Sequence, residues 1–268
     1  MLPDIKELQE LITQAARQEL LARFAEASLY HKHEHKPDGS IVSAADIAMQ
    51  RFMKIELAQR WPQYGFLGEE MPAHEQQQII NNQQKGFWCL DPLDGTSNFA
   101  AGIPFFAVAL ALIMGGEIVI GLVYDPMSDE CFTAQKGQGA WLNGKRLQAG
   151  ITQRALSESI AVVDFKRLAV PLAIKLVTHP PYYSQRNFGS VALEWCWLAA
   201  GRFHVYLHGQ QKLWDYAAGS LILSEAGGHA LTLEGTTIGN DGLESCSAVA
   251  AHDSGLFEEW KDWLQANH

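Results

Sequence analysis

The chain has 268 residues, of which 47% are hydrophobic and 19% charged, and its formal net charge is −10 at pH 7. This composition is that of an ordinary globular protein and excludes a disordered or fibrous chain. The acidic balance argues against a nucleic-acid partner, because phosphate backbones favour basic surfaces. An anionic substrate would require bound cations that reverse the local sign of the field.

Neither a membrane segment nor a disulfide framework is predicted. The longest strongly apolar stretch, residues 105–114, is too short to span a bilayer, and the N-terminal residues lack the pattern of a signal peptide. The four cysteines stand far apart without a Cys-x-x-Cys pair, so we expect reduced, buried thiols. We therefore expect a cytoplasmic protein without a membrane partner.

Two amphipathic helices are predicted at the start of the chain. Apolar residues recur at helical spacing over residues 4–29 and again over residues 43–61. Ser43 and Asp46 match the Ser-x-x-Asp form of a capping box at the start of the second helix. The residues of this helix expected to face inward are Ile47, Phe52, Ile55 and Ala58.

Strands and helices follow in a pattern typical of layered α/β sheets. Residues 87–90 predict a buried strand that ends at Asp91, and Gly115-Gly116 joins two β-rich runs as a hairpin. The later expected elements are strands at 131–134, 160–163, 203–207, 229–233 and 248–251, and helices at 168–177, 190–200, 216–226 and 254–265. We expect a single domain over 1–268, softly divided into a metal-site α+β half (1–151) and an α/β half (152–268).

The most informative segment is Asp91-Pro92-Leu93-Asp94-Gly95-Thr96, which follows the predicted buried strand. It places two carboxylates three residues apart on a turn stiffened by proline, so that both can face one cation. Hard ions such as Mg²⁺ prefer oxygen ligands, which makes the carbonyl of Leu93 a natural third donor. Gly95 would let a phosphate approach the backbone closely.

Two further acidic residues stand at the ends of predicted elements. Glu69 follows a short apolar stretch, and Asp215 lies in the first turn of a predicted helix. Each has a structural explanation by itself, since acidic residues are common in solvated turns and stabilise helix N-termini. Together with the two aspartates of the turn, they indicate a cluster of carboxylates around one pocket.

These motifs resemble the inositol monophosphatase family. The resemblance covers nearly the whole chain and rests on residues 68–70, on residues 88–99, and on Trp214-Asp215 leading into residues 217–219 and 225–228. It implies a mixed α/β fold of the α+β type, a layered αβαβα sandwich of the inositol monophosphatase and fructose bisphosphatase kind. It also implies a homodimer, inhibition by Li⁺, and a phosphoric monoester hydrolase of the inositol-phosphate phosphatase type.

The resemblance further implies which residues hold metal. One Mg²⁺ would bind Glu69, Asp91 and the carbonyl of Leu93, and a second would bind Asp91, Asp94 and Asp215, with room for a third, weaker ion. The physics agrees, because close carboxylates repel by roughly 4 kcal/mol per pair at an effective dielectric near 20. Metal makes such a cluster tolerable and supplies the charge stabilisation that phosphate ester hydrolysis needs.

The implied chemistry is direct attack of a metal-activated water on the phosphate of a small polyol or sugar. Glu69 and the hydroxyl of Thr96 would orient and deprotonate this water, and Asp46 would bond to Thr96. The implied substrate contacts are Asp94, Gly95, Thr96, Arg186, Gly189, Ser190, His208 and Asp215.

The identity of the substrate stays open at this point. Family members that prefer inositol usually carry a glutamate seven residues before the last metal aspartate, where this chain has His208. Alternative substrates are fructose 1,6-bisphosphate, phosphoadenosine phosphate, histidinol phosphate and NADP, and an alternative function is that of a partner-binding protein that retains the fold.

The histidine-rich stretch with His31, His33 and His35 is interpreted as a solvated loop. Lys36, in the same stretch, is the candidate residue to reach the active site.

A phosphatase of the haloacid dehalogenase type is a rival interpretation, because Asp94-Gly95-Thr96 is similar to its motif. Those enzymes place two aspartates two residues apart near the N-terminus and phosphorylate one of them. Here the aspartates are three residues apart, at positions 91 and 94. The spacing favours direct attack by water.

Overall fold

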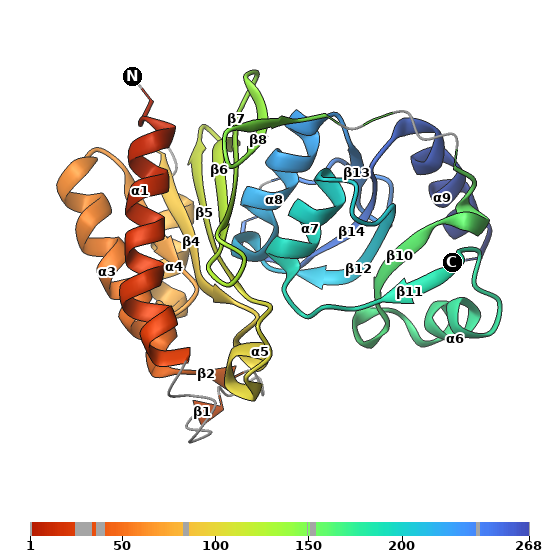
Figure 1. The fold of residues 1–268 in the computed structure, drawn as a ribbon, viewed down its shortest axis with the longest axis horizontal. Helices are drawn as coiled ribbons and strands as arrows, with labels where there is room; N and C mark the ends of the chain where they lie inside the picture. Colours follow the sequence, from red (N-terminus) through yellow and green to blue (C-terminus); the bar gives the residue numbers. More distant parts are fainter. Residues whose placement is uncertain are drawn as a thin grey trace.

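Five layers stack along the long axis of the molecule in the order helix, sheet, helix, sheet, helix (Figure 1). The computed structural model describes residues 2–24, 34–35, 41–82, 86–148, 150, 154–239 and 242–267, with backbone alone at 34–35 and 41–42. The expected αβαβα sandwich is therefore confirmed. Within the described residues, no helix is long and apolar enough to cross a membrane. All four cysteines are buried and free, as expected.

The first sheet has seven strands in the order β3-β4-β5-β6-β7-β8-β9. They are β3 (Gly65–Gly68), β4 (Phe87–Asp94), β5 (Ala107–Met114), β6 (Glu117–Asp125), β7 (Glu130–Gln135), β8 (Gly139–Leu142) and β9 (Lys145–Leu147). Strands β3 and β4 pair in parallel, and the other neighbours in this sheet pair antiparallel.

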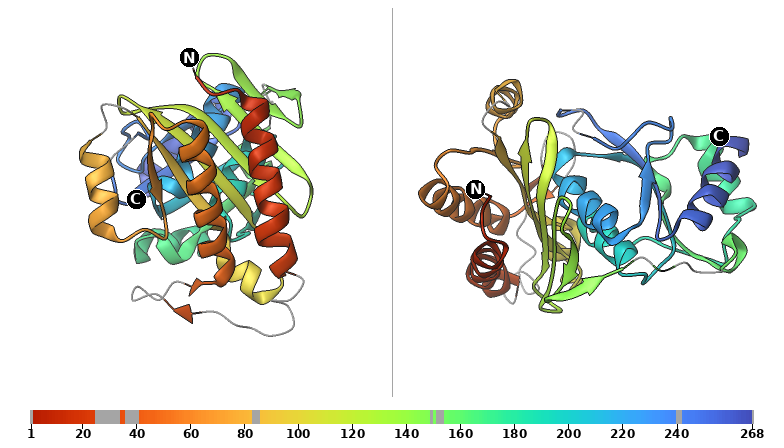
Figure 2. Two further views of the ribbon diagram at one scale, coloured as in Figure 1. Left: turned by 90° about the vertical axis from the view of Figure 1, so that its left-hand side faces the viewer. Right: turned by 90° about the horizontal axis from the view of Figure 1, so that it is seen from above.

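Helices cover the outer face of this sheet (Figure 2). They are α1 (Ile5–Ala16), which continues into the π-helical η1 (Arg17–Leu21), and α3 (Ala44–Arg60). The remaining elements of this part are the short antiparallel pair β1 (Glu34–His35) and β2 (Ile41–Val42), and the connecting helices α4 (Ala73–Asn81) and α5 (Thr96–Ala101).

The second sheet has five strands in the order β11-β10-β12-β14-β13. They are β10 (Ile160–Asp164), β11 (Ser184–Arg186), β12 (Val205–Gln211), β13 (His229–Leu231) and β14 (Cys246–Ala251). The middle helix layer is made of α7 (Val191–Ala199) and α8 (Leu213–Ala226), and the outer layer of α6 (Val170–Thr178) and α9 (Ser254–Asn267). Two short 3₁₀ turns, η3 (Leu156–Glu158) and η4 (Phe165–Arg167), flank β10.

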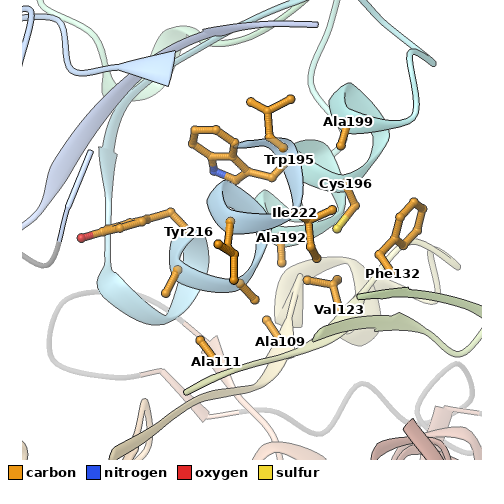
Figure 3. Close-up of a cluster of buried hydrophobic side chains, with 14 of the residues drawn as sticks. Ala109, Ala111, Val123, Phe132, Ala192, Trp195, Cys196, Ala199, Tyr216 and Ile222 are labelled. Atoms are coloured by element: carbon orange, nitrogen blue, oxygen red, sulfur yellow. The ribbon is translucent and has the colours of Figure 1, made fainter. Parts of the chain in front are cut away.

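Strand β5 shows how the first sheet binds the layers together. Successive side chains of a strand point to opposite faces, so a strand covered on both faces is apolar throughout. Leu110 and Leu112 pack with the outer helices, whereas Ala109 and Ala111 face the middle layer (Figure 3). Small residues on the inner face let α7 and α8 come close to the sheet.

The expected inward face of α3 is wrong for three of its four residues, whereas Phe52 is partly buried and packs against the core between the outer helices and the first sheet. Ile47 and Ile55 are 51% and 47% exposed, and Ala58 is also exposed. The buried residues of this helix are Ala45, Asp46, Met49, Met53 and Leu57. The helix carries two apolar stripes, and the one with regular four-residue spacing and flexible methionines faces the sheet. Spacing alone does not distinguish two such stripes on one helix.

Candidate active site

The two aspartates of the turn lie where β4 ends against β5. The pairing of these strands shifts register between Asp91 and Asp94, and Pro92 has no N–H to contribute to the ladder. Strand β3 runs parallel to β4 and ends beside it, and the backbone N–H of Glu69 donates to the carbonyl of Leu90 at 3.1 Å. The parallel register therefore brings Glu69 next to Asp91.

Each of the two aspartates is fixed by backbone or hydroxyl donors. The N–H of Leu93 donates to Asp91 Oδ1 at 3.0 Å. The hydroxyl of Ser190 and the N–H of Ala192 donate to Asp94 Oδ2 at 2.5 and 2.7 Å. Ser190 and Ala192 belong to the start of α7, so Asp94 ties the end of β4 to the middle helix layer.

Asp215 enters the same region from the first turn of α8. Its Oδ2 accepts a hydrogen bond at 2.8 Å from the N–H of Lys212, the residue that caps this helix. Helix α8 begins at Leu213, two residues after β12 ends at Gln211. The short connection leaves Asp215 at the edge where β12 ends.

Burial and the charges of neighbouring carboxylates raise the pKa of the three aspartates. Burial, followed by the charges of Glu69, Asp94 and Asp215, raises the pKa of Asp91 well above its usual range. Burial, followed by the charges of Asp94 and Glu69, does the same to Asp215. Burial raises the pKa of Asp94 to about 6, against the hydrogen bonds that stabilise its ionised form. Residues from three distant stretches therefore lie within range of one another's charge.

The donors suit a hard divalent cation. Carboxylate and carbonyl oxygens are the ligands that Mg²⁺ prefers, and a cation would relieve the repulsion that raises the pKa values of these aspartates. In the part of the chain that the structure describes, no three acidic, histidine or cysteine side chains are arranged as a finished metal-binding group.

Thr96 and Asp46 form a hydrogen-bonded pair beside this cluster. The hydroxyl of Thr96 lies 3.0 Å from Asp46 Oδ1 and 2.9 Å from the carbonyl oxygen of Leu93. Ser43 donates to Asp46 Oδ2 from both its N–H and its hydroxyl, at 2.8 and 2.6 Å, in the expected capping box. Burial raises the pKa of Asp46 to about 6. Asp46 thus caps α3 and holds Thr96 at the same time.

The turn after Asp94 is packed against the start of α7. Gly95 has φ +97°, and a Cβ there would lie 3.0 Å from the carbonyl oxygen of Phe105 and 3.3 Å from that of Gly189. Asn98 Nδ2 donates to the carbonyl oxygens of Phe105 and Phe188 at 2.8 and 2.7 Å. Glycine is therefore required at position 95, and Asn98 was not singled out from the sequence because its partners are distant backbone groups.

The remaining predicted substrate contacts lie in the second sheet. Arg186 ends β11, is exposed, and donates to Ser184 Oγ and to the carbonyl oxygen of Gln185. His208 lies in β12 and is only 3% exposed. Of the histidine-rich stretch, His31, His33 and Lys36 lie outside the described residues, and only the backbone of His35 is described.

A cavity of about 960 Å³ lies elsewhere in the described part of the chain. It is lined by Arg154, Ser157, Glu158, Ile160, Tyr183, Gly201, His204 and His252. It shares no residue with the acidic cluster, and it is open to solvent. Perturbed carboxylates that converge from several elements are the stronger indication of an active site.

Similarity to known proteins extends over nearly the whole chain. A sequence profile of the inositol monophosphatase family matches residues 3–264. The chain is 37% identical over 223 residues to an inositol-1-monophosphatase of Rhizobium meliloti, covering 81% of this chain and 80% of that protein. It is 36% identical over 200 residues to the Nus factor SuhB of Salmonella typhimurium, covering 72% of each. It superposes on the structure of SaIMPase-II with bound inositol monophosphate at a TM-score of 0.78 and 26% identity, covering 97% of this chain and 94% of that one. The chain therefore belongs to the inositol monophosphatase family.

Proposed function

We propose that the chain is a Mg²⁺-dependent phosphomonoesterase that hydrolyses a small phosphorylated polyol or sugar, such as inositol monophosphate, by direct attack of water. The observation that carries this proposal is the cluster of Glu69, Asp91, Asp94 and Asp215, in which burial and then the neighbouring charges raise the pKa of Asp91 and Asp215 well above their usual range. The names of the Rhizobium relative and of the inositol-monophosphate complex of SaIMPase-II support the substrate class.

The chain would hold two ions, with Asp91 shared between them. Glu69 and the carbonyl of Leu93 would complete one set of ligands, and Asp94 and Asp215 the other. When bound, a divalent cation lowers the pKa of a coordinated water and offsets the charge of the phosphate. Asp94 stays in place because the hydroxyl of Ser190 and the N–H of Ala192 already hold one of its oxygens.

Thr96 and Glu69 would position the attacking water and accept its proton. With Asp46 ionised, the single hydroxyl proton of Thr96 can point at Asp46 Oδ1, 3.0 Å away. A lone pair of the Thr96 oxygen is then free to accept a hydrogen bond from water. The backbone N–H groups of Gly95 and Thr96 would bind phosphate oxygens.

Phosphate release with and without Mg²⁺ tests the proposal. The substrates are inositol 1-phosphate, fructose 1,6-bisphosphate, phosphoadenosine phosphate, histidinol phosphate and NADP, each with Mg²⁺ and then with EDTA. We expect turnover of the polyol phosphate that stops with EDTA. Asp91→Asn should lower kcat on the order of 10²-fold or more, because it removes a ligand shared by both ions. Asp262→Asn, on the exposed side of α9, is the control and should keep full activity.

The Asp91→Asn protein should fold, because the change removes a buried charge that its neighbours repel. A thermal midpoint at or above that of the unchanged protein verifies this. Equal turnover with EDTA, or full activity of Asp91→Asn, would contradict the proposed function.

A second candidate is a partner-binding protein that keeps the family fold, because a relative that is 36% identical is named the Nus factor SuhB. The same variant separates the two ideas. A protein that acts only through a partner would keep its cellular role after Asp91→Asn, whereas a phosphatase would lose its role together with turnover.

A further inference from the structure

Asp164 and His208 form a pair at the ends of two neighbouring strands. Strands β10 and β12 are parallel, and their register places Asp164 directly beside His208. His208 Nε2 lies 3.3 Å from Asp164 Oδ2. The side chain of Asp164 is 19% exposed, whereas that of His208 is 4% exposed. The carboxylate therefore reaches the surface, and the imidazole lies behind it.

The surrounding backbone fixes how His208 is used. The N–H of Gln210 donates to His208 Nδ1 at 3.2 Å, so the ring proton of the neutral imidazole sits on Nε2 and points at Asp164. The ring stacks on Tyr206 with centroids 6.2 Å apart. At Gly209, a Cβ would lie 1.8 Å from the carbonyl oxygen of Arg167, so β12 is in tight contact with η4, the turn that follows β10. His208 is held rigidly in one orientation.

Asp164 is held at both of its oxygens and keeps its charge. The N–H of Lys166 donates to Oδ1 at 3.1 Å, and Arg167 Nε lies 3.9 Å from Oδ2. Burial opposes ionisation, but the hydrogen bonds from His208 and Lys166 and the charge of Arg167 outweigh it, and the pKa of Asp164 lies below its usual value. A carboxylate offers about four lone-pair positions, so this one retains capacity to accept further hydrogen bonds.

The pair lies beside the acidic cluster. Parallel strands end at one edge of a sheet, which in α/β folds is where ligands bind. Helix α8, which carries Asp215, begins at this edge directly after β12. The charge of Arg167 acts on Asp215, and the charges of Asp164 and Asp94 both act on Glu194. A fixed, partly exposed carboxylate therefore lies at the same sheet edge from which Asp215 enters the site.

We propose that Asp164 determines substrate specificity by accepting hydrogen bonds from hydroxyl groups of the substrate, and that His208 is its positioning residue. This rests on the proposed function. A carboxylate accepts hydrogen bonds from hydroxyls and repels a second phosphate, so the pair selects a monophosphate whose remaining groups are neutral hydroxyls. His208 itself is only 3% exposed, and we assign the substrate contact that was expected of it to Asp164 on the neighbouring strand.

Asp164→Asn tests this with two substrates in the presence of Mg²⁺. Inositol 1-phosphate carries hydroxyls, and p-nitrophenyl phosphate carries none. We expect KM for inositol 1-phosphate to rise about tenfold or more with kcat little changed, as for the loss of a hydrogen bond to a charged group. Hydrolysis of p-nitrophenyl phosphate should stay the same. Asp262→Asn is the matched control and should change neither.

Two variants of His208 test the positioning role. His208→Gln keeps a side-chain N–H that can reach Asp164, and we expect KM for inositol 1-phosphate close to that of the unchanged protein. His208→Phe keeps the ring against Tyr206 but has no donor, and we expect the rise in KM seen with Asp164→Asn. If KM for inositol 1-phosphate rises equally in His208→Gln and His208→Phe, the positioning role is overturned, because the rise would then come from altered packing and not from the lost hydrogen-bond donor.

The inference on Asp164 and the proposed function fail in different ways. If Asp164→Asn leaves KM for inositol 1-phosphate unchanged, or weakens both substrates equally, the specificity role is wrong while the phosphatase stands. The specificity role is also overturned if the unchanged protein hydrolyses p-nitrophenyl phosphate but not inositol 1-phosphate. If it hydrolyses neither with Mg²⁺, the proposed function is wrong and this inference is overturned with it.

Discussion

Glu194 is a buried carboxyl that organises the backbone next to the acidic cluster. It is 3% exposed, and its Oε1 accepts hydrogen bonds from the N–H groups of Phe188 and Gly189 at 2.9 and 3.1 Å. Burial, together with the charges of Asp94 and Asp164, raises its pKa from 4.5 to about 8. The side chain therefore folds with a proton attached at neutral pH.

This raised pKa predicts a pH dependence of stability. Below pH 4.5 the carboxyl is neutral in both states, and between pH 4.5 and about 8 only the folded state keeps the proton. The free energy of unfolding should therefore fall as pH rises through this window, by up to about 1.4 kcal/mol per pH unit from this group. Above about pH 8 the contribution is constant.

Glu194→Gln isolates this effect, because the amide oxygen can still accept both N–H groups but the side chain does not titrate. In metal-free protein we expect the free energy of unfolding, from urea denaturation at pH 5 and pH 7.5, to change less with pH in the variant. The same pH dependence in both proteins would show that Glu194 folds ionised.

At the scale of elements, the contact between β6 and α8 determines how closely the middle helix layer approaches the first sheet. A Cβ on Gly121 would lie 2.7 Å from the carbonyl oxygen of Ala218 and 3.1 Å from its Cα, both backbone atoms. Ala109 and Ala111 of β5 and Ala192 of α7 pack in the same buried cluster (Figure 3). Helix α8 also carries Asp215, so this contact sets the position of a site residue.

Gly121→Ala should therefore destabilise the fold by about 1–3 kcal/mol, as for an overpacked core. Gly255→Ala is the control, because its Cβ would meet only Asp253 Oδ1 at an ordinary 3.5 Å. Urea denaturation of both variants measures the difference. A Gly121→Ala protein as stable as the control would mean that α8 sits less tightly on β6 than described.

Most elements were predictable from the sequence because their signals are local. The strand that ends in the aspartate turn, the Gly115-Gly116 hairpin and the capped start of α3 are all found as expected. Helix α4 was not predicted, since its Gln-rich sequence has little apolar periodicity. Strand β12 was placed at 203–207 but runs from Val205 to Gln211, because its polar end is buried by pairing with β14.

The candidate site was predictable only where a motif is contiguous or recurs in a known family. Asp91 and Asp94 come from one turn, and their neighbourhood with Asp215 followed from the family resemblance. The pairing of Asp164 with His208 depends on the register of two strands far apart in the chain. His208 was named from the family resemblance, but Asp164 has no local signal. Glu194 was missed for the same reason, since its partners are backbone N–H groups.

At the scale of the whole molecule, the site lies where the two sheets share one core. A single buried cluster joins Cys89 and Val123 of the first sheet to Trp195 and Tyr216 of the middle helices and to Tyr206 of the second sheet. The acidic cluster likewise draws its residues from both halves of the chain, with Asp91 from the first half and Asp215 from the second. We propose that the two halves act as one unit, since separating them would take the site apart.

The central claim is that these carboxylates bind divalent cations together, and the free energy of unfolding of the metal-stripped protein as Mg²⁺ is added tests it most directly. Binding to the folded state alone should raise this free energy by about 2.7 kcal/mol at a hundredfold excess over Kd. In Asp91→Asn, the rise should be largely lost. If Mg²⁺ leaves the stability of the unchanged protein where it was, or stabilises the variant equally, the carboxylates do not form a shared cation site.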